Sequence, residues 1–168
     1  AAKGAEETVE HGVVIVATGA YELETDEYLL GASERVMTQR ELESRIAGKD
    51  AGIASAKSIV MIQCVGSRTS ERPWCSRYCC SEAIKNAFEI KAQRPGARVI
   101  VLAKDIRTYG FRELKFQEAR EKGVIFVRYP ETQDPKVSAA GGTLAVRVVD
   151  GATGHELLLQ PDLLALSV

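Results

Sequence analysis

Short apolar runs that alternate with helical patterns constrain the fold of this chain more than any other feature of its sequence. Runs typical of buried strands occupy residues 58–63, 98–103 and 124–127. Between them, residues 78–94 carry apolar side chains at helical spacing, and residues 111–122 are compatible with a second helix. Because parallel strands need a crossover between them, this βαβαβ order predicts a doubly wound parallel sheet with helices on both faces.

A further strand and a short helix are expected before this unit. Residues 11–20 form a continuous apolar run that closes on Gly19, which is typical of a central strand in a parallel sheet. A globular domain seldom opens on such a strand, so we expect that a longer polypeptide continues upstream. Thr38 and Glu41 have the spacing of a capping box, which predicts a helix that ends near Gly48.

The last part of the chain has the pattern of antiparallel structure. Residues 143–149 and 156–160 flank a glycine-containing turn and predict a hairpin, residues 163–167 predict one last strand, and residues 138–142 predict a flexible link. The fold class expected from the whole pattern is α/β: a Rossmann-like parallel sheet flanked by helices, with an antiparallel hairpin near the C-terminus.

Charge and hydropathy exclude two classes of partner. The 168 residues include 22 basic and 23 acidic side chains and carry a net charge of −1. This balance provides no basic field for nucleic acid or anionic lipid, so we expect no nucleic-acid partner. No apolar run approaches the roughly 20 residues that cross a bilayer, so we expect no membrane span and a cytoplasmic protein.

Four cysteines form the most informative local pattern. The first follows a predicted strand and the last two begin a predicted helix, which predicts one compact pocket for Cys64, Cys75, Cys79 and Cys80. Thiolates are the metal-binding form of cysteine. We expect the helix N-terminus and three nearby arginines, Arg68, Arg72 and Arg77, to lower the pKa values of these thiols.

An iron–sulfur cluster suits this pattern better than the alternatives do. A mononuclear zinc site is the first competitor, but the adjacent Cys79 and Cys80 strain the geometry of one tetrahedral ion. In a cluster, neighbouring cysteines can each bind a separate iron. Unligated buried thiols remain a second alternative, because cysteine is among the residues most often buried. A redox dithiol is a third, although the pattern has no Cys-x-x-Cys motif.

Other polar residues carry weaker signals. Asp105 follows a predicted strand, where related folds bind ribose, but a salt bridge to Arg107 or another neighbour explains it better. Trp74 is expected either to shield a metal centre or to anchor the loop by packing. His11 and His155 stand alone in turn-like settings, so we assign no catalytic residue.

Three motifs resemble one known family. The motifs are Cys-Val-Gly-Ser-Arg at 64–68, Pro-Trp-Cys-Ser-Arg-Tyr-Cys-Cys at 73–80 and Asp-Ile-Arg-Thr-Tyr-Gly at 105–110. In this order they resemble the A subunit of the heterodisulfide reductases, including fusions with a hydrogenase subunit. The resemblance extends over most of the chain.

The resemblance implies a fragment of a thioredoxin-reductase-like flavoprotein with two dinucleotide-binding domains. Residues 1–55 match the end of the FAD-type domain with a connecting helix. Residues 56–131 match the nicotinamide-type Rossmann-like domain that carries the cysteines. Residues 132–168 match a hairpin and a return strand to the FAD-type domain.

The resemblance also implies cofactors and partners. The four cysteines match the ligands of a [4Fe-4S] cluster, and in the full-length protein FAD is contacted by a turn comprising Thr18, Gly19 and Ala20. The implied role is an electron-transfer module between flavin and partner subunits. Those partners are other heterodisulfide reductase subunits and a hydrogenase or formate dehydrogenase donor, so the isolated fragment is expected to be inactive.

Overall fold

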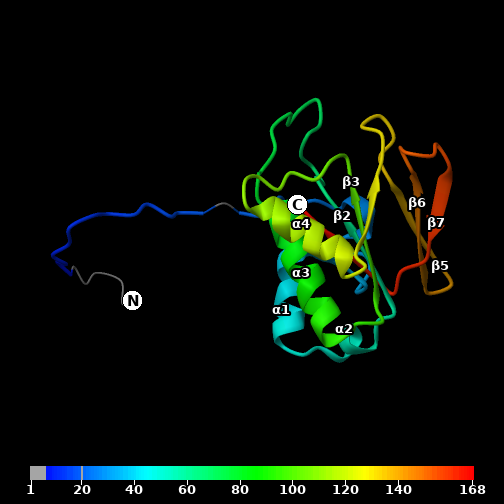
Figure 1. The fold of residues 1–168 in the computed structure, drawn as a ribbon, viewed down its shortest axis with the longest axis horizontal. Helices are drawn as coiled ribbons and strands as arrows, with labels where there is room; N and C mark the ends of the chain where they lie inside the picture. The colour runs from blue at the N-terminus through cyan, green and yellow to red at the C-terminus, as the bar shows by residue number, and fades with distance from the viewer. Residues whose placement is uncertain (1–6, 20) are drawn as a thin grey trace.

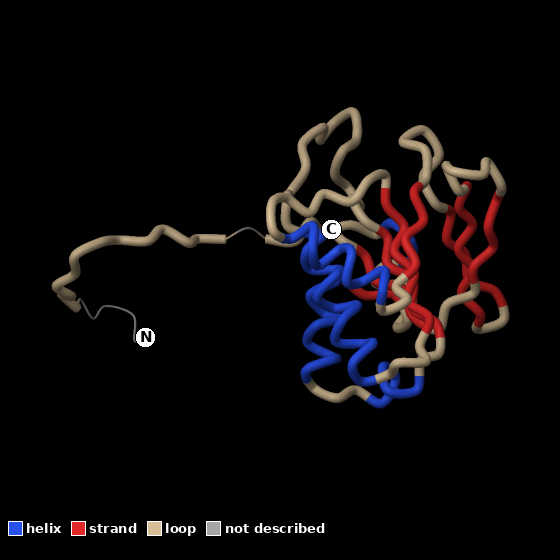
Figure 2. Tube along the Cα trace, viewed as in Figure 1, coloured by secondary structure: helices blue, strands red, loops and turns tan. Residues whose placement is uncertain are grey.

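The computed structural model describes residues 7–19 and 21–168. Its folded part has three layers: α1, α3 and α4 lie on one face of a five-stranded parallel sheet, and a three-stranded antiparallel sheet lies on the other (Figures 1 and 2). The α/β class with a C-terminal hairpin is thereby confirmed. The expectation of helices on both faces is wrong, because the antiparallel sheet covers the second face.

Eight strands and four α-helices make up these layers within the described residues. The parallel sheet has the order β1 (Val36–Thr38), β8 (Leu163–Leu166), β2 (Ser58–Ile62), β3 (Arg98–Ala103) and β4 (Ile125–Arg128). The antiparallel sheet contains β5 (Lys136–Ala140), β6 (Thr143–Val149) and β7 (Glu156–Leu159). The helices are α1 (Gln39–Ala47), α2 (Ala51–Ser55), α3 (Cys79–Gln93) and α4 (Arg112–Glu121), and a 3-10 turn lies at Glu27–Leu29.

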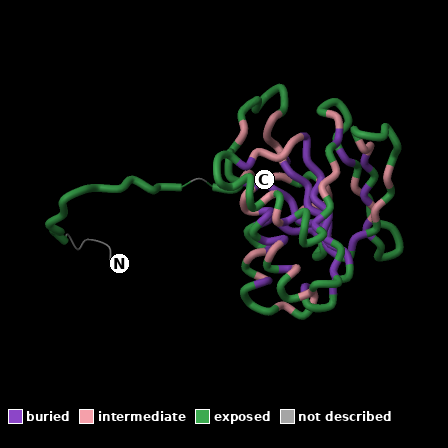
Figure 3. Tube along the Cα trace, in the orientation of Figure 1, coloured by how far each residue is buried: buried purple, intermediate pink, exposed green. Residues whose placement is uncertain are grey.

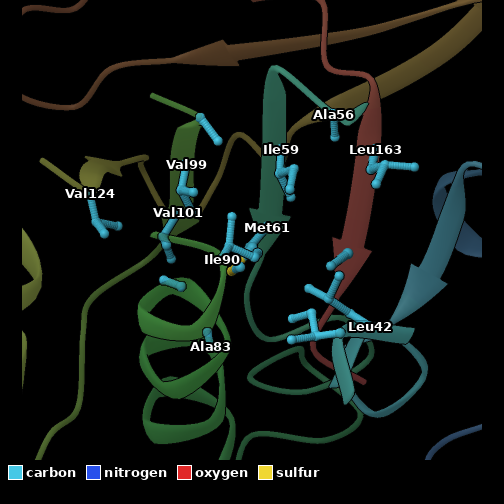
Figure 4. Close-up of a cluster of buried hydrophobic side chains, with 14 of the residues drawn as sticks. Leu42, Ala56, Ile59, Met61, Ala83, Ile90, Val99, Val101, Val124 and Leu163 are labelled. Carbon is cyan, nitrogen blue, oxygen red and sulfur yellow. The ribbon is translucent and has the colours of Figure 1, made fainter. Parts of the chain in front are cut away.

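Strand alternation explains how the parallel sheet is covered on both faces. Ile59 and Met61 of β2 point into the core beneath the helices, beside Ala83 and Ile90 of α3 (Figure 4). The intervening Val60 and Ile62 belong to the second core, which the hairpin covers. A strand that is buried on both faces has no polar face, which is why β2 is a continuous apolar run.

The expected helix after Thr38 is confirmed, and so is its capping box. Thr38 Oγ1 accepts a hydrogen bond from the backbone N–H of Glu41 at 3.2 Å, and the Glu41 carboxylate accepts one from the Thr38 N–H at 2.7 Å. This reciprocal arrangement satisfies two backbone donors that would otherwise lack partners at the start of α1.

The apolar run at residues 11–20 does not form the expected strand. The structure describes its residues 11–19, and these belong to neither a strand nor a helix. Val13 and Ile15 are 74% and 83% exposed, and the segment leads away from the folded body (Figure 3). A strand requires a neighbour for its backbone hydrogen bonds, and none of the described strands pairs with this segment.

The expected flexible link at residues 138–142 is also wrong. Most of it belongs to β5, which pairs with β6 so that Ala140 lies opposite Thr143. Gly141 and Gly142 form the connection with φ values of +56° and +75°. A two-residue hairpin turn of type I′ requires positive φ at both central residues, and glycine adopts positive φ without steric penalty.

The last strand, β8, joins the parallel sheet. β8 pairs in parallel with β1 on one side and with β2 on the other. Its four residues are all buried, and a strand buried in this way needs partners on both edges. The parallel sheet therefore contains strands from all three expected parts of the chain, while the boundaries of those parts stay a prediction.

Asp162 fixes the start of β8 and predicts a pH dependence of stability. Its carboxylate accepts hydrogen bonds from the backbone N–H groups of Ser58 at 2.9 Å and Lys57 at 2.7 Å, which hold the pKa of Asp162 below its ordinary value of 3.8. The folded state therefore gains stability from ionised Asp162 above that value and loses it as the pH falls through the lower pKa of the folded state.

We expect Asp162→Asn to lower the thermal unfolding midpoint at neutral pH and to bring it close to that of the unchanged protein in strong acid. Unfolding midpoints across the acid range measure this difference. The exposed Asp26 provides a matched control as Asp26→Asn. Parallel midpoint curves for the protein and Asp162→Asn would contradict the assignment.

Candidate metal centre

The candidate site lies at the carboxyl end of the parallel sheet. Cys64 follows β2, a loop of residues 65–78 carries Cys75, and α3 begins at Cys79 and Cys80. Figures 1 and 2 show this loop and the loop after β3 at the same end of the molecule. Open parallel sheets bind their ligands outside the carboxyl ends of their strands.

A bulge directly after β2 turns Cys64 out of the line of the strand. The N–H of Ser167 donates to the carbonyl of Ile62 at 2.9 Å, and the return bond to the Ser167 carbonyl comes from Val65 at 3.0 Å. A regular parallel ladder would use the N–H of Cys64 for that return bond. Cys64 is therefore an extra residue, with φ of +64°, and bulges of this kind redirect a side chain.

The loop after the bulge has an unusual backbone. Gly66, Arg68 and Arg77 have φ values of +67°, +55° and +60°. The positive φ of Gly66 favours glycine, and a Cβ there would lie 2.1 Å from a methyl carbon of Leu23, whose side chain would have to move. Backbone strain at non-glycine residues persists where the surrounding structure enforces it, and such sites are often functional.

All four thiols are free, and the structure describes each of them. Cys79 and Cys80 are buried, whereas Cys64 and Cys75 are half-buried. The hydroxyl of Ser76 lies 2.6 Å from Cys79 Sγ. The strand end, the loop and the helix start thus each carry thiols at the same end of the parallel sheet, and a shared metal site for them stays a prediction.

Backbone N–H groups point at two of the sulfurs. The N–H of Arg77 donates to Cys75 Sγ at 3.3 Å. The N–H of Arg107, from the loop after β3, donates to Cys80 Sγ at 3.4 Å. Such bonds favour the thiolate and recur around metal-bound cysteine. The contribution of Arg107 could not be found from the cysteine spacing, because it comes from a separate loop.

Burial and mutual negative charge raise the pKa values of three of the thiols. Burial raises the pKa of Cys80 to about 11, and negative charge on Cys64, Cys79 and Cys75 adds to this rise. Burial also raises the pKa values of Cys64 and Cys79, and both are raised further by charge on Cys75. Charge influences of this kind act only over short distances inside a protein.

The expectation that arginines and the helix N-terminus lower the thiol pKa values is wrong for Cys64, Cys79 and Cys80, whose pKa values are raised. Arg68 does lower the pKa of Cys64, but removal of that thiol from water raises it more. Burial is likewise the largest cause at Cys79 and Cys80. Burial therefore favours the protonated form of Cys64, Cys79 and Cys80, and a bound metal would have to displace these protons.

A network of ion pairs holds the cysteine loop, residues 65–78, against neighbouring segments. The guanidinium of Arg68, only 9% exposed, pairs with Asp105 and with Glu131. Asp105 also pairs with Arg107 at 3.1 Å, which confirms the salt bridge expected at this position. Lys104 donates to the carbonyl of Arg68 at 3.3 Å. The network links the cysteine loop to the loop after β3.

Several residues singled out in the sequence lie outside this arrangement. Trp74 is 66% exposed, so it neither anchors the loop nor shields the thiols. Thr18 is exposed, Ala20 lies outside the described residues, and Gly19 lines a cavity of about 710 Å³ together with Cys79. The expected FAD turn is thus only partly described.

Two features are absent from the described part of the chain. Residues 7–19 and 21–168 contain no group of three or more His, Cys, Asp or Glu side chains arranged to hold a metal ion. Within the same residues, none of the helices combines the length and the apolar character needed to cross a membrane.

Sequence comparison identifies relatives that match nearly the whole chain. The A subunit of the H(2)/formate:CoB-CoM heterodisulfide,ferredoxin reductase of Methanococcus maripaludis is 35% identical over 98% of this chain. The A subunit of the ferredoxin:CoB-CoM heterodisulfide reductase of Methanosarcina acetivorans is 32% identical over 93%. This chain is a relative of the heterodisulfide reductase A subunit. The resemblance predicted from the cysteine motifs is thereby confirmed.

The heterodisulfide reductase relatives are much longer than this chain. It covers 27% of the Methanococcus protein and 24% of the Methanosarcina protein. A third relative, the first iron-sulfur A subunit of the CoB–CoM heterodisulfide reductase of Methanopyrus kandleri, is 35% identical over 92% of this chain, which covers 26% of it. The chain thus spans about a quarter of each relative.

Two other comparisons add little. No protein-family model matches the sequence. The crystal structure of T. acidophilum thioredoxin reductase superposes with a TM-score of 0.45 at 14% identity, over 80% of this chain and 36% of that one. A likeness at this level does not establish a shared fold.

Proposed function

We propose that Cys64, Cys75, Cys79 and Cys80 hold one [4Fe-4S] cluster and that this chain is an electron-transfer module of a flavoprotein similar to the heterodisulfide reductase A subunit. The observation that carries the proposal is the position of four free thiols at one end of the sheet: Cys64 follows β2, Cys75 lies in the next loop, and Cys79 and Cys80 begin α3. Besides burial, negative charge on Cys75 raises the pKa of each of the other three thiols. A cluster of several irons accommodates the adjacent Cys79 and Cys80, because each can bind its own iron.

The chemistry of the donor set fits such a group. Four thiolates bring negative charge, and Arg68 lies close enough to Cys64 to lower its pKa. The N–H groups of Arg77 and Arg107 point at the sulfurs of Cys75 and Cys80, where they would stabilise thiolate charge after metal binding. A bound cluster supplies one-electron transfer, and these surroundings determine how easily it is reduced.

The wider role of the module is proposed from its relatives. Their names include hydrogen, formate, ferredoxin and the CoB–CoM heterodisulfide. By this analogy the full-length protein contains FAD, forms a complex with other heterodisulfide reductase subunits, and receives electrons from a hydrogenase or formate dehydrogenase. Gly19 lines the same cavity as Cys79, which supports a flavin contact near the thiols. The three-part division at residues 55 and 131 belongs to the same proposal.

Anaerobic reconstitution of the chain with iron and sulfide tests the cluster. We expect about four irons per chain and a broad visible absorbance that bleaches on reduction, because a cubane binds four cysteine ligands. Iron and sulfide analysis together with an absorption spectrum measure this outcome. A colourless protein with stoichiometric zinc would support the zinc-stabilised alternative, and a protein that takes up no metal would support a metal-free scaffold.

A further inference from the structure

Unsatisfied polar atoms gather at one place in the described core. Five buried side-chain atoms have no hydrogen-bond partner among the described residues: Gln39 Nε2, Gln63 Nε2, Gln63 Oε1, Asn86 Oδ1 and Ser167 Oγ. Native proteins pair nearly all of their buried polar atoms, so each exception requires an explanation. Here the exceptions belong to only four residues, each at most 2% exposed.

Strand register places three of these residues in one row across the sheet. Ile62 lies opposite Leu166, so the next residues, Gln63 and Ser167, are neighbours. Thr38 also lies opposite Leu166, which puts Gln39 on the other side of Ser167. The row crosses the sheet at the carboxyl ends of β1, β8 and β2.

The row faces the helices. Gln63 continues the side of β2 that carries Ile59 and Met61, and both belong to the core beneath α3. Because α3 returns from the end of β2 to the start of the parallel β3, its first turn lies over the carboxyl end of β2. That first turn carries Cys79 and Cys80. Gln63 therefore lies beneath the helix start and directly before Cys64.

Gln63 differs from the other amides of this group. Asn86 donates to the backbone oxygen of Gln39 at 3.0 Å and to its side-chain oxygen at 2.9 Å, so these two amides are each partly satisfied. Both the nitrogen and the oxygen of the Gln63 amide lack a partner among the described residues. A fully buried amide with neither end paired is strongly disfavoured unless something absent from the protein binds it.

We propose that the Gln63 side chain donates a hydrogen bond to a sulfur of the cluster and thereby raises its reduction potential, an inference that rests on the proposed function. Gln63 directly precedes Cys64 and lies beneath the first turn of α3, which carries Cys79 and Cys80, so a cluster held there would offer sulfur acceptors to the unpaired N–H group. Reduction adds negative charge to the cluster. A donor at the sulfurs stabilises that charge, so the reduced state is favoured.

Gln63→Leu tests this role through the reduction potential of the reconstituted cluster. We expect the midpoint potential to fall, with the ratio of oxidised to reduced cluster changing roughly tenfold at a fixed applied potential, or about 59 mV for a one-electron couple. A redox titration followed by absorbance or electron paramagnetic resonance measures the shift. Asn86→Leu is the matched control, because Asn86 lies six residues, or roughly 9 Å of helix, beyond Cys80.

Thermal unfolding of the metal-free protein provides a second readout. Gln63→Leu should leave the unfolding midpoint of the metal-free protein unchanged or higher, because it removes an unpaired amide, whereas Asn86→Leu should lower it by breaking the bonds to Gln39. A purely structural Gln63 would lower the metal-free midpoint and leave the potential unchanged.

The outcomes separate this inference from the proposed function. Equal potentials for the unchanged protein and Gln63→Leu, with full iron content in both, would overturn the inference and leave the cluster in place. Equal shifts in Gln63→Leu and Asn86→Leu would also overturn it, since the effect would then come from general loss of polarity. Failure of the unchanged protein to bind iron would overturn both proposals.

Discussion

Cys64→Ser should lose most of its iron on reconstitution while keeping its fold. Cys64 follows β2, eleven positions before Cys75, whereas Cys79 begins α3. An equal loss of iron in Cys64→Ser and Cys79→Ser would therefore indicate that both thiols bind the same cluster. Serine oxygen is a poor substitute for a thiolate at iron. Circular dichroism of the metal-free variants checks the fold, and iron analysis with visible absorbance checks the cluster.

Ser76→Ala is the matched control for this prediction. The Ser76 hydroxyl contacts Cys79 Sγ at 2.6 Å, so its removal disturbs the same loop without removing a thiol. We expect Ser76→Ala to retain most of the iron. Retention of full iron content by Cys64→Ser would remove Cys64 from the ligand set and contradict the proposed four-cysteine site.

The elements that the sequence predicted best are those with a strong local cause. The continuous apolar run of β2 reflects burial on both faces, and the helical spacing of Ile84 and Ala87 reflects one buried face of α3. The capping pair Thr38 and Glu41 is also local, since its two hydrogen bonds join residues three apart. In each case the residues that determine the element are part of it.

The elements that the sequence failed to predict depend on distant partners. The run at 11–19 has the composition of a central strand, but composition does not supply neighbouring strands. β1 is only three residues long and owes its place to β8, more than a hundred residues later. The Gly141-Gly142 pair was a visible hairpin signal, and only its interpretation as a flexible link was wrong.

The candidate site, like the fold, has a part that the sequence could predict and a part that it could not. Spacing alone predicted that the four cysteines would gather, because a strand end and the start of the following helix are close in a parallel fold. The N–H group of Arg107 and the bulge at Cys64 come from pairing with other segments. The signs of the thiol pKa shifts depend on burial, which the sequence does not give for a loop.

Leu164→Ala should strongly destabilise the protein, by about 2–5 kcal/mol of unfolding free energy, because it leaves a cavity in the core. Leu164 is fully buried, and it lies opposite Val36 of β1 and Val60 of β2. It also packs in the core beneath the hairpin. Such a loss is a large part of the roughly 5–15 kcal/mol that stabilises a typical domain.

Leu158→Ala provides the same chemical change on the surface. Leu158 lies in β7 and is 52% exposed, so its truncation should change the unfolding free energy by no more than about 0.5 kcal/mol. Urea unfolding of both variants, compared with the unchanged protein, measures the difference. Equal small effects in the two variants would mean that β8 is not held between β1 and β2 and would contradict the observed pairing.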